Sequence, residues 1–131
     1  MRPVLCVGLV CLDQVTVVDS FPKEDTDQRS TDQYKVSYLF ELEPHSNLSY
    51  HKVRGGNANN SCTVLSRLGF KTSFYGSLAT GLEADWVVEG MQEDGVIVED
   101  CPRYSGYPCP NSVVITNSST GSRTIIHTNL G

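Results

Sequence analysis

The sequence predicts an α/β layered fold, because strand-like and helix-like patterns alternate along most of its length. The first pattern is a near-continuous apolar run over Val4–Leu12, which is typical of a central strand covered on both faces of a parallel sheet. The second is a helical repeat of apolar residues that begins at Ala58 and stops before Gly69. The third is a pair of short apolar runs near the C-terminus, which indicates a β-hairpin.

The elements follow in order from these patterns. The β-branched stretch Val15–Val18 extends the first strand, and the polar segment Phe21–Asp25 ends it in a turn. Residues 28–52 keep no sustained period, so they predict a loop with strand fragments. The expected later elements are a helix over Ala58–Leu68, a strand over Thr72–Leu78, a helix over Leu82–Glu93 that ends at Gly95, and hairpin strands over Ser112–Thr116 and Arg123–His127.

Composition excludes several classes of function. The 131 residues carry a net charge of -5 and no cluster of Lys and Arg, which disfavours nucleic acid as a partner. The longest apolar stretch is too short to span a membrane. The five cysteines form no C-x-x-C pair and lie mostly inside apolar patterns, so buried thiols are favoured over disulfides, a metal site or a nucleophile. A reduced, cytoplasmic protein is therefore expected, and the scattered histidines predict no zinc site.

Two polar groups stand where chain geometry favours ligand binding. Gly56, Asn57 and Asn60 open the predicted helix, where glycine admits close backbone approach and amides both donate and accept hydrogen bonds. That combination suits a polyol, although on spacing alone a simple helix N-cap at Asn57 is favoured. Asp13 follows the first apolar run, at the strand end where open parallel sheets bind ligands, and the alternative there is an Asx turn. Together they resemble a carbohydrate clamp.

Longer stretches make the resemblance specific. In this order they are Leu5-Cys6-Val7-Gly8-Leu9-Val10-Cys11-Leu12-Asp13, Phe21-Pro22-Lys23-Glu24-Asp25, Arg54-Gly55-Gly56-Asn57-Ala58-Asn59-Asn60-Ser61 and Gly121-Ser122-Arg123-Thr124-Ile125. The chain thus resembles the pfkB, or ribokinase-like, carbohydrate kinases over most of its length. The resemblance implies a doubly wound α/β domain with a small β-sheet lid, here the N-terminal portion over residues 1–131. The lid strands would occupy about residues 14–36 and 107–128.

The resemblance also implies roles for residues. Asp13, Gly56, Asn57 and Asn60 would hold the hydroxyls of the sugar, and Arg123 would lie near the ATP phosphates, which a guanidinium matches well. Without the resemblance, Arg123 would be read as an exposed hairpin charge. ATP and Mg²⁺ are the implied cofactors, with K⁺ as a further candidate, and the lid would form a homodimer.

Two departures from the family pattern bear on function. The Gly-Ala-Gly-Asp motif, whose Asp takes the proton from the sugar hydroxyl, is absent, so no catalytic residue is assigned and the domain looks truncated at its C-terminus. Residues 37–53 have no counterpart, and we expect a dispensable insertion there, either a lid extension or a mis-joined exon.

The expected function is ATP-dependent phosphorylation of a ketohexose, fructose to fructose 1-phosphate, with this chain holding the sugar-binding half. The alternative is a non-catalytic form that binds sugar or pairs with full-length subunits.

Overall fold

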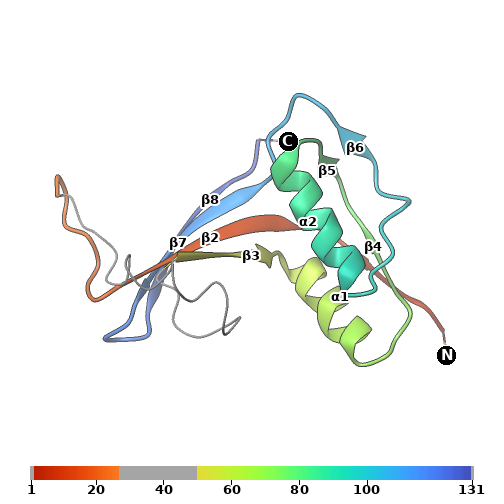
Figure 1. Cartoon of the computed structure of the whole chain (residues 1–131), viewed down its shortest axis with the longest axis horizontal. Helices are drawn as coiled ribbons and strands as arrows, with labels where there is room; N and C mark the ends of the chain where they lie inside the picture. Colours follow the sequence, from red (N-terminus) through yellow and green to blue (C-terminus); the bar gives the residue numbers. More distant parts are fainter. Residues whose placement is uncertain (1, 27–49, 131) are drawn as a thin grey trace, which may run out of the picture. The chain divides into compact units, whose positions relative to one another are not determined.

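The computed structural model describes residues 2–26 and 50–130, which fall into two compact units. Unit 1 comprises residues 1–13, 54–111 and 128–131, and unit 2 comprises residues 14–53 and 112–127. Figure 1 shows the elements in chain order, with both helices in unit 1. The predicted α/β character therefore belongs to unit 1, whereas the described elements of unit 2 are strands.

Parallel strand pairs form the sheet structure of unit 1. Strand β1 (Val4–Val7) pairs in parallel with β4 (Thr72–Tyr75), and Ile97 adds a parallel bridge to Ser73. A second parallel pair joins β5 (Leu78–Ala79) to β6 (Arg103–Tyr104). Parallel neighbours need a crossover between them, and the helices that the sequence predicted supply it.

The apolar run over Val4–Leu12 is not one strand, as the sequence had predicted. Strand β1 ends at Val7 and β2 (Cys11–Val18) begins at Cys11, so residues 8–10 separate two strands that belong to different sheets. The prediction that this strand is covered on both faces is also wrong for the described residues. Leu5 and Val7 of β1 are 61% and 67% exposed. An apolar run indicates only that its side chains favour burial; it does not specify which surface buries them.

Both predicted helices are confirmed. Helix α1 spans Asn57–Arg67 and helix α2 spans Leu82–Glu93, within one residue of the predicted bounds. Gly69 and Gly95 follow them with φ values of 89° and 82°. The next residues, Phe70 and Val96, donate their N–H groups back to the last turns of the two helices. This is a Schellman ending, in which glycine adopts the left-handed conformation at little cost.

One buried cluster holds the helices against β1 and β4. Phe74 of β4 is 2% exposed and Met91 of α2 is fully buried, and Cys62 places α1 in the same cluster. The strand predicted over Thr72–Leu78 is divided into β4 and β5 at Gly76. The remaining members of the cluster are Val10, Leu12, Leu78, Ala79, Ala84, Val87, Val96, Val98, Cys101 and Cys109.

Unit 2 contains a four-stranded sheet with the order β3-β2-β7-β8. The predicted hairpin is confirmed, since β7 (Asn111–Asn117) and β8 (Arg123–Thr128) are neighbours. Asn117 organises its turn by accepting the N–H groups of Ser119 and Thr120 at 2.9 and 3.2 Å. An Asn side chain that mimics a backbone acceptor is a common way to build such a turn.

The last three residues of the loop predicted over residues 28–52 belong to a strand in the structure. Strand β3 (Tyr50–Gly55) lies beside β2, and the Tyr50 hydroxyl donates to Gln14 Oε1 at 3.3 Å. The last residues of the proposed insertion over 37–53 therefore belong to a strand. The rest of that segment lies outside the described residues, so the expectation that it is dispensable stays untested.

The core cluster gives a first testable prediction. Replacing Phe74 by Ala removes a 2% exposed ring from the core cluster and should cost about 3–5 kcal/mol of unfolding free energy. The neighbouring Tyr75 is 44% exposed, so Tyr75→Ala is the matched control and should cost far less. Urea unfolding of both variants measures the difference, and equal losses would contradict this description of the core.

Candidate functional site

A close approach of two backbone segments builds the candidate site in unit 1. A Cβ atom on Gly56 would lie 2.2 Å from the Leu9 carbonyl oxygen, and one on Gly55 would lie 2.3 Å from Asp13 Oδ2. Only glycine lets the turn between β3 and α1 pass so near the chain that leads into β2. The turn thus brings the Asp13 carboxylate directly against the backbone that starts α1.

Asp13 does not lie beyond a strand end, as the sequence had suggested, but is the third residue of β2. The alternative of an Asx turn is therefore wrong as well. The carboxylate is half-buried, and the Cys11 thiol donates to its Oδ1 at 3.4 Å. A weak thiol donor leaves most of the carboxylate's accepting capacity for a ligand.

The start of α1 has no side-chain cap. Its N-cap residue is Gly56, with φ 94°, so the interpretation of Asn57 as the N-cap is wrong. Asn57 is the first helical residue, and its side chain and that of Asn60 are exposed. Free N–H groups of a first turn carry partial positive charge and favour oxygen ligands. The structure therefore places Asp13 beside Gly55, directly before Gly56, and places Asn57 and Asn60 in the first turn of the helix that follows.

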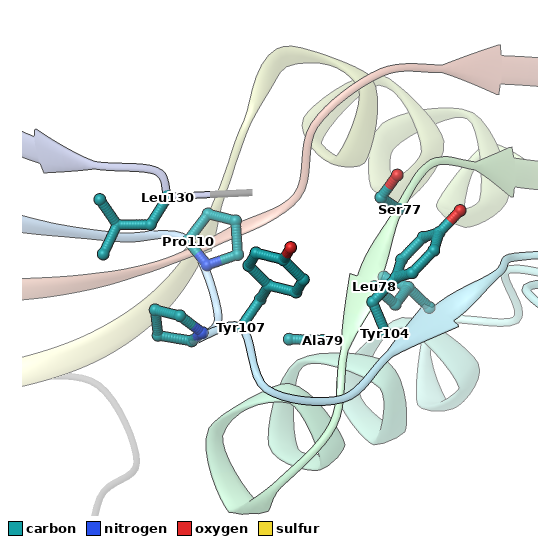
Figure 2. Close-up of a pocket in the computed structure, with 8 residues that line it drawn as sticks. Ser77, Leu78, Ala79, Tyr104, Tyr107, Pro110 and Leu130 are labelled. Carbon is teal, nitrogen blue, oxygen red and sulfur yellow. The ribbon is translucent and has the colours of Figure 1, made fainter.

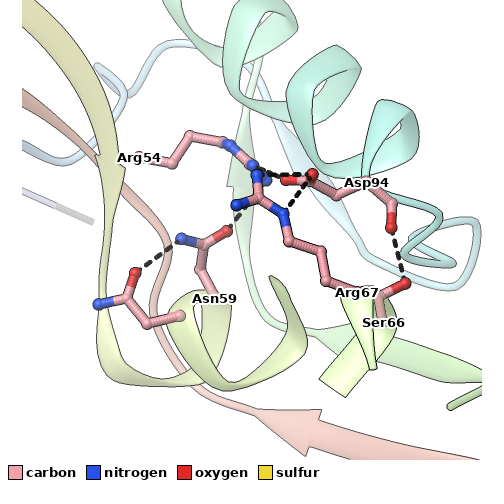
Figure 3. Close-up of polar contacts among 6 residues, drawn as sticks. Arg54, Asn59, Ser66, Arg67 and Asp94 are labelled. Carbon is pink, nitrogen blue, oxygen red and sulfur yellow. Dashed lines mark hydrogen bonds and ion pairs between the residues drawn. The ribbon is translucent and has the colours of Figure 1, made fainter. Parts of the chain in front are cut away.

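A partly exposed polar network that local sequence patterns do not indicate lies next to this turn (Figure 3). Arg54, at the end of β3, donates to Asn59 Oδ1 at 3.3 Å and forms an ion pair with Asp94 after α2. Arg67 donates to Asp94 Oδ1 through Nε and Nη2 at 3.1 and 2.9 Å. The Ser66 hydroxyl donates to the Asp94 carbonyl at 2.6 Å. These contacts tie β3, α1 and the end of α2 together.

Asp94 is the acceptor at the centre of this network. Burial alone would raise the pKa of its carboxyl, but hydrogen bonds from Arg67 and Arg54 outweigh burial and hold the pKa below the ordinary value of 3.8. Asp94 is therefore ionised at neutral pH and keeps both guanidinium groups in place.

Arg123, the predicted phosphate contact, lies on β8 in unit 2 and is exposed. It has no ion-pair partner among the described residues, so its charge is available to a ligand. It is the one predicted site residue that does not belong to unit 1.

A separate pocket of about 400 Å³ lies in unit 1, and Figure 2 shows its lining. Its walls are mostly apolar, with hydroxyls from Ser77, Tyr104 and Tyr107. None of its residues was selected from the sequence, because they lie in a short strand pair and in irregular segments without a motif. The full lining is Ser77, Leu78, Ala79, Tyr104, Tyr107, Pro108, Pro110 and Leu130.

The cysteines are mostly buried, and no metal-holding group is found among residues 2–26 and 50–130. All five cysteines are free thiols, and four of them are buried. Burial raises the pKa of the Cys62 thiol to about 12, so it is not a nucleophile at neutral pH. No group of three or more His, Cys, Asp or Glu side chains in these ranges is placed to hold a metal ion. No helix in these ranges is long and apolar enough to cross a membrane.

Comparison with known proteins finds similarity over nearly the whole of this chain. Residues 1–130 match the family model of the pfkB family of carbohydrate kinases. The chain is similar to ketohexokinase of Mus musculus, with 46% identity over 125 residues. That match covers 95% of this chain but 36% of the mouse protein, so the chain spans about a third of this relative.

Solved structures show the fold. The ribokinase of Giardia lamblia superposes with a TM-score of 0.76 at 17% identity, over 98% of this chain and 36% of that one. The ribokinase of Arabidopsis thaliana, solved with ribose and ATP, gives a TM-score of 0.72 at 20% identity, over 96% and 35% of the two chains. The predicted ribokinase-like α/β fold is confirmed, and this chain corresponds to about a third of it.

The Asp94 network predicts a pH-dependent stability. Asp94→Asn should cost about 3 kcal/mol at pH 7, because Arg54 keeps its buried charge and loses its partner. Asp85 also pairs with an arginine, Arg103, but both side chains are well exposed, so the control Asp85→Asn should change stability by less than about 1 kcal/mol.

The pKa of Asp94 is lower in the folded chain, so its contribution is present above the unfolded value and is lost as pH falls through the folded one. Urea unfolding between pH 7 and pH 2 should show the parent and Asp94→Asn curves converging in acid. A gap that persists unchanged at the lowest pH would contradict the role of the ionised carboxylate.

Proposed function

Because the chain belongs to the pfkB family of carbohydrate kinases, we propose that it is the sugar-binding portion of an ATP-dependent ketohexose kinase. The whole enzyme would transfer the terminal phosphoryl group of ATP to the primary hydroxyl of fructose, giving fructose 1-phosphate. The 46% identity with mouse ketohexokinase supports a ketohexose as the sugar. The observation that carries the proposal is the Asp13 carboxylate held against the turn that starts α1.

The chemistry of this site fits a neutral polyol better than an anion. The uncapped first turn of α1 would attract an anion, but the negative charge of Asp13 beside it opposes one. A sugar hydroxyl can donate to the carboxylate and accept from an N–H group at the same time. Asp13 would accept two hydroxyls, Asn57 and Asn60 would bind further hydroxyls, and Gly56 would let the sugar approach the backbone.

Arg123 is proposed as the contact to the ATP phosphates. Its exposed guanidinium has no ion-pair partner in the described residues and matches phosphate oxygens bidentately. The Arabidopsis ribokinase was solved with both ribose and ATP, which supports ATP as the second ligand. No group of three His, Cys, Asp or Glu side chains that could hold a metal is found among residues 2–26 and 50–130, and we assign no ligand of Mg²⁺ or K⁺ among them.

A second candidate function is pairing with full-length subunits without catalysis. The 131 residues contain no Gly-Ala-Gly-Asp sequence, so no side chain is available as the proposed general base. Strand β8 ends the sheet of unit 2, and its Ile125 and Ile126 are 48% and 60% exposed. Exposed apolar side chains at a sheet edge favour contact with another subunit. The free, mostly buried thiols support a reducing compartment, and we propose the cytoplasm.

The sugar site predicts a crossed pattern of binding losses. Asp13→Asn and Asn57→Ala should each weaken fructose binding by about tenfold, because each leaves a sugar hydroxyl without its partner. Arg123→Ala should leave fructose binding unchanged and weaken ATP binding. Calorimetric titration of the chain with each ligand measures both affinities. Fructose binding that survives Asp13→Asn and Asn57→Ala at full strength would refute the assignment of the sugar site.

The absence of the Gly-Ala-Gly-Asp motif predicts that this chain alone does not phosphorylate fructose. Purified 131-residue protein with ATP, Mg²⁺ and fructose should show no phosphorylation above background, because it carries no candidate base. Mouse ketohexokinase, assayed in parallel, is the positive control. Turnover that persists through repeated purification and disappears in Asp13→Asn would show that a base is present after all.

A further inference from the structure

Asn59 is a buried polar side chain in the helix that carries Asn57 and Asn60 of the proposed sugar site. It lies in the first turn of α1 and is 2% exposed, whereas its neighbour Asn60 is exposed. A buried amide is costly unless its oxygen and its nitrogen both find partners. Asn59 Oδ1 accepts from Arg54 Nη1 at 3.3 Å, and Asn59 Nδ2 donates to Asn60 Oδ1 at 3.2 Å.

The chemistry of these partners fixes which way each amide faces. A guanidinium can only donate hydrogen bonds, so the group that Asn59 turns toward Arg54 must be its oxygen. The Asn59 NH₂ group then faces Asn60. Because an NH₂ group can only donate, the Asn60 side chain must accept through its oxygen. The remaining group of Asn60 is its NH₂, which has no acceptor in the described part of the chain.

Arg54 is itself held in place, so the sequence of contacts has a fixed starting point. Its ion pair with Asp94 is partly buried, with the two side chains 13% and 16% exposed. Gly90 of α2 makes room for it, since a Cβ atom there would lie 3.1 Å from Arg54 Nε. A guanidinium held by a carboxylate and seated on a glycine has few alternative positions.

We infer that Asn59 is a positioning residue that makes Asn60 a hydrogen-bond donor toward the ligand. The inference rests on the proposed sugar site and deepens it. Asp13 can only accept, and the NH₂ group that Asn60 leaves free can only donate, so the two residues offer one acceptor and one donor. The ligand must then present a hydroxyl hydrogen to Asp13 and an oxygen lone pair to Asn60, and two hydroxyls of a polyol can do both.

The orientation can be tested without any sugar by NMR of the carboxamide protons. In the parent chain, the Asn60 NH₂ protons should exchange with water about as fast as those of the exposed Asn57. Asn59→Asp keeps the acceptor for Arg54 but replaces the donor by an oxygen, so Asn60 should turn over and donate to the new carboxylate. Its NH₂ exchange should then slow and its resonances should move downfield. Unchanged Asn60 exchange in Asn59→Asp would overturn the inference.

Fructose titration provides the second arm. Asn59→Asp should weaken fructose binding by about tenfold, because the site then presents two acceptors, and Asn59→Ala should weaken it less, because Asn60 is merely released. In an Asn60→Ala background, Asn59→Asp should add almost no further loss. A purely structural role would instead make the two losses add. Gln92→Glu on the exposed face of α2 is the control for the change of amide to carboxylate.

The two arms separate the possible failures. Thermal unfolding identifies any variant that fails to fold, and Asn59→Ala, which introduces no charge, then replaces Asn59→Asp in the cycle. If the Asn60 amide turns over as expected but the parent chain does not bind fructose, the sugar-site proposal fails and the positioning role stands. If fructose binds and the losses of Asn59 and Asn60 variants add, the positioning role fails and the sugar site stands.

Discussion

The close contact between the β3–α1 turn and the backbone that enters β2 is the constraint on which the site depends. A side chain on Gly55 or Gly56 would overlap the Asp13 carboxylate or the Leu9 carbonyl. A second close approach lies one residue earlier in the chain, because a Cβ atom on Gly76 would lie 2.2 Å from the Gly8 carbonyl oxygen. Such short distances to a hypothetical Cβ atom mean that no side chain fits between the segments. The acidic group and the helix start are therefore held together by shape before any ligand is present.

A second constraint is electrostatic, and Asp94 satisfies it. Arg54 and Arg67 come from β3 and α1 and would repel one another across the small gap between them. One carboxylate that accepts from both guanidinium groups removes that repulsion and also fixes the end of α2. Arg54 is largely buried, and its charge would be costly there without a partner. The ion pair with Asp94 offsets that cost.

Local signals in the sequence account for what could be predicted. The ends of α1 and α2 depend on glycines two residues beyond the last helical turn, and such endings are legible in sequence. The Arg54–Asp94 pair joins residues 40 positions apart, and no local pattern encodes such a partner. Strand β3 was missed at Tyr50 because its exposed, polar alternation is that of an edge strand and not of a core strand. The burial of Asn59 could not be predicted from the sequence, because asparagine is usually an exposed residue.

The buried position of Asn59 couples the stability of α1 to the proposed ligand site. Its amide is satisfied on one side by the charged network and on the other by an exposed residue of the site. An apolar side chain of similar size could fill the same space without needing either partner. The polar side chain supplies an acceptor to Arg54 and a donor to Asn60. What Asn60 gains is a fixed orientation, so a ligand that accepts from its NH₂ group meets a donor already in place and does not have to spend binding energy on ordering it.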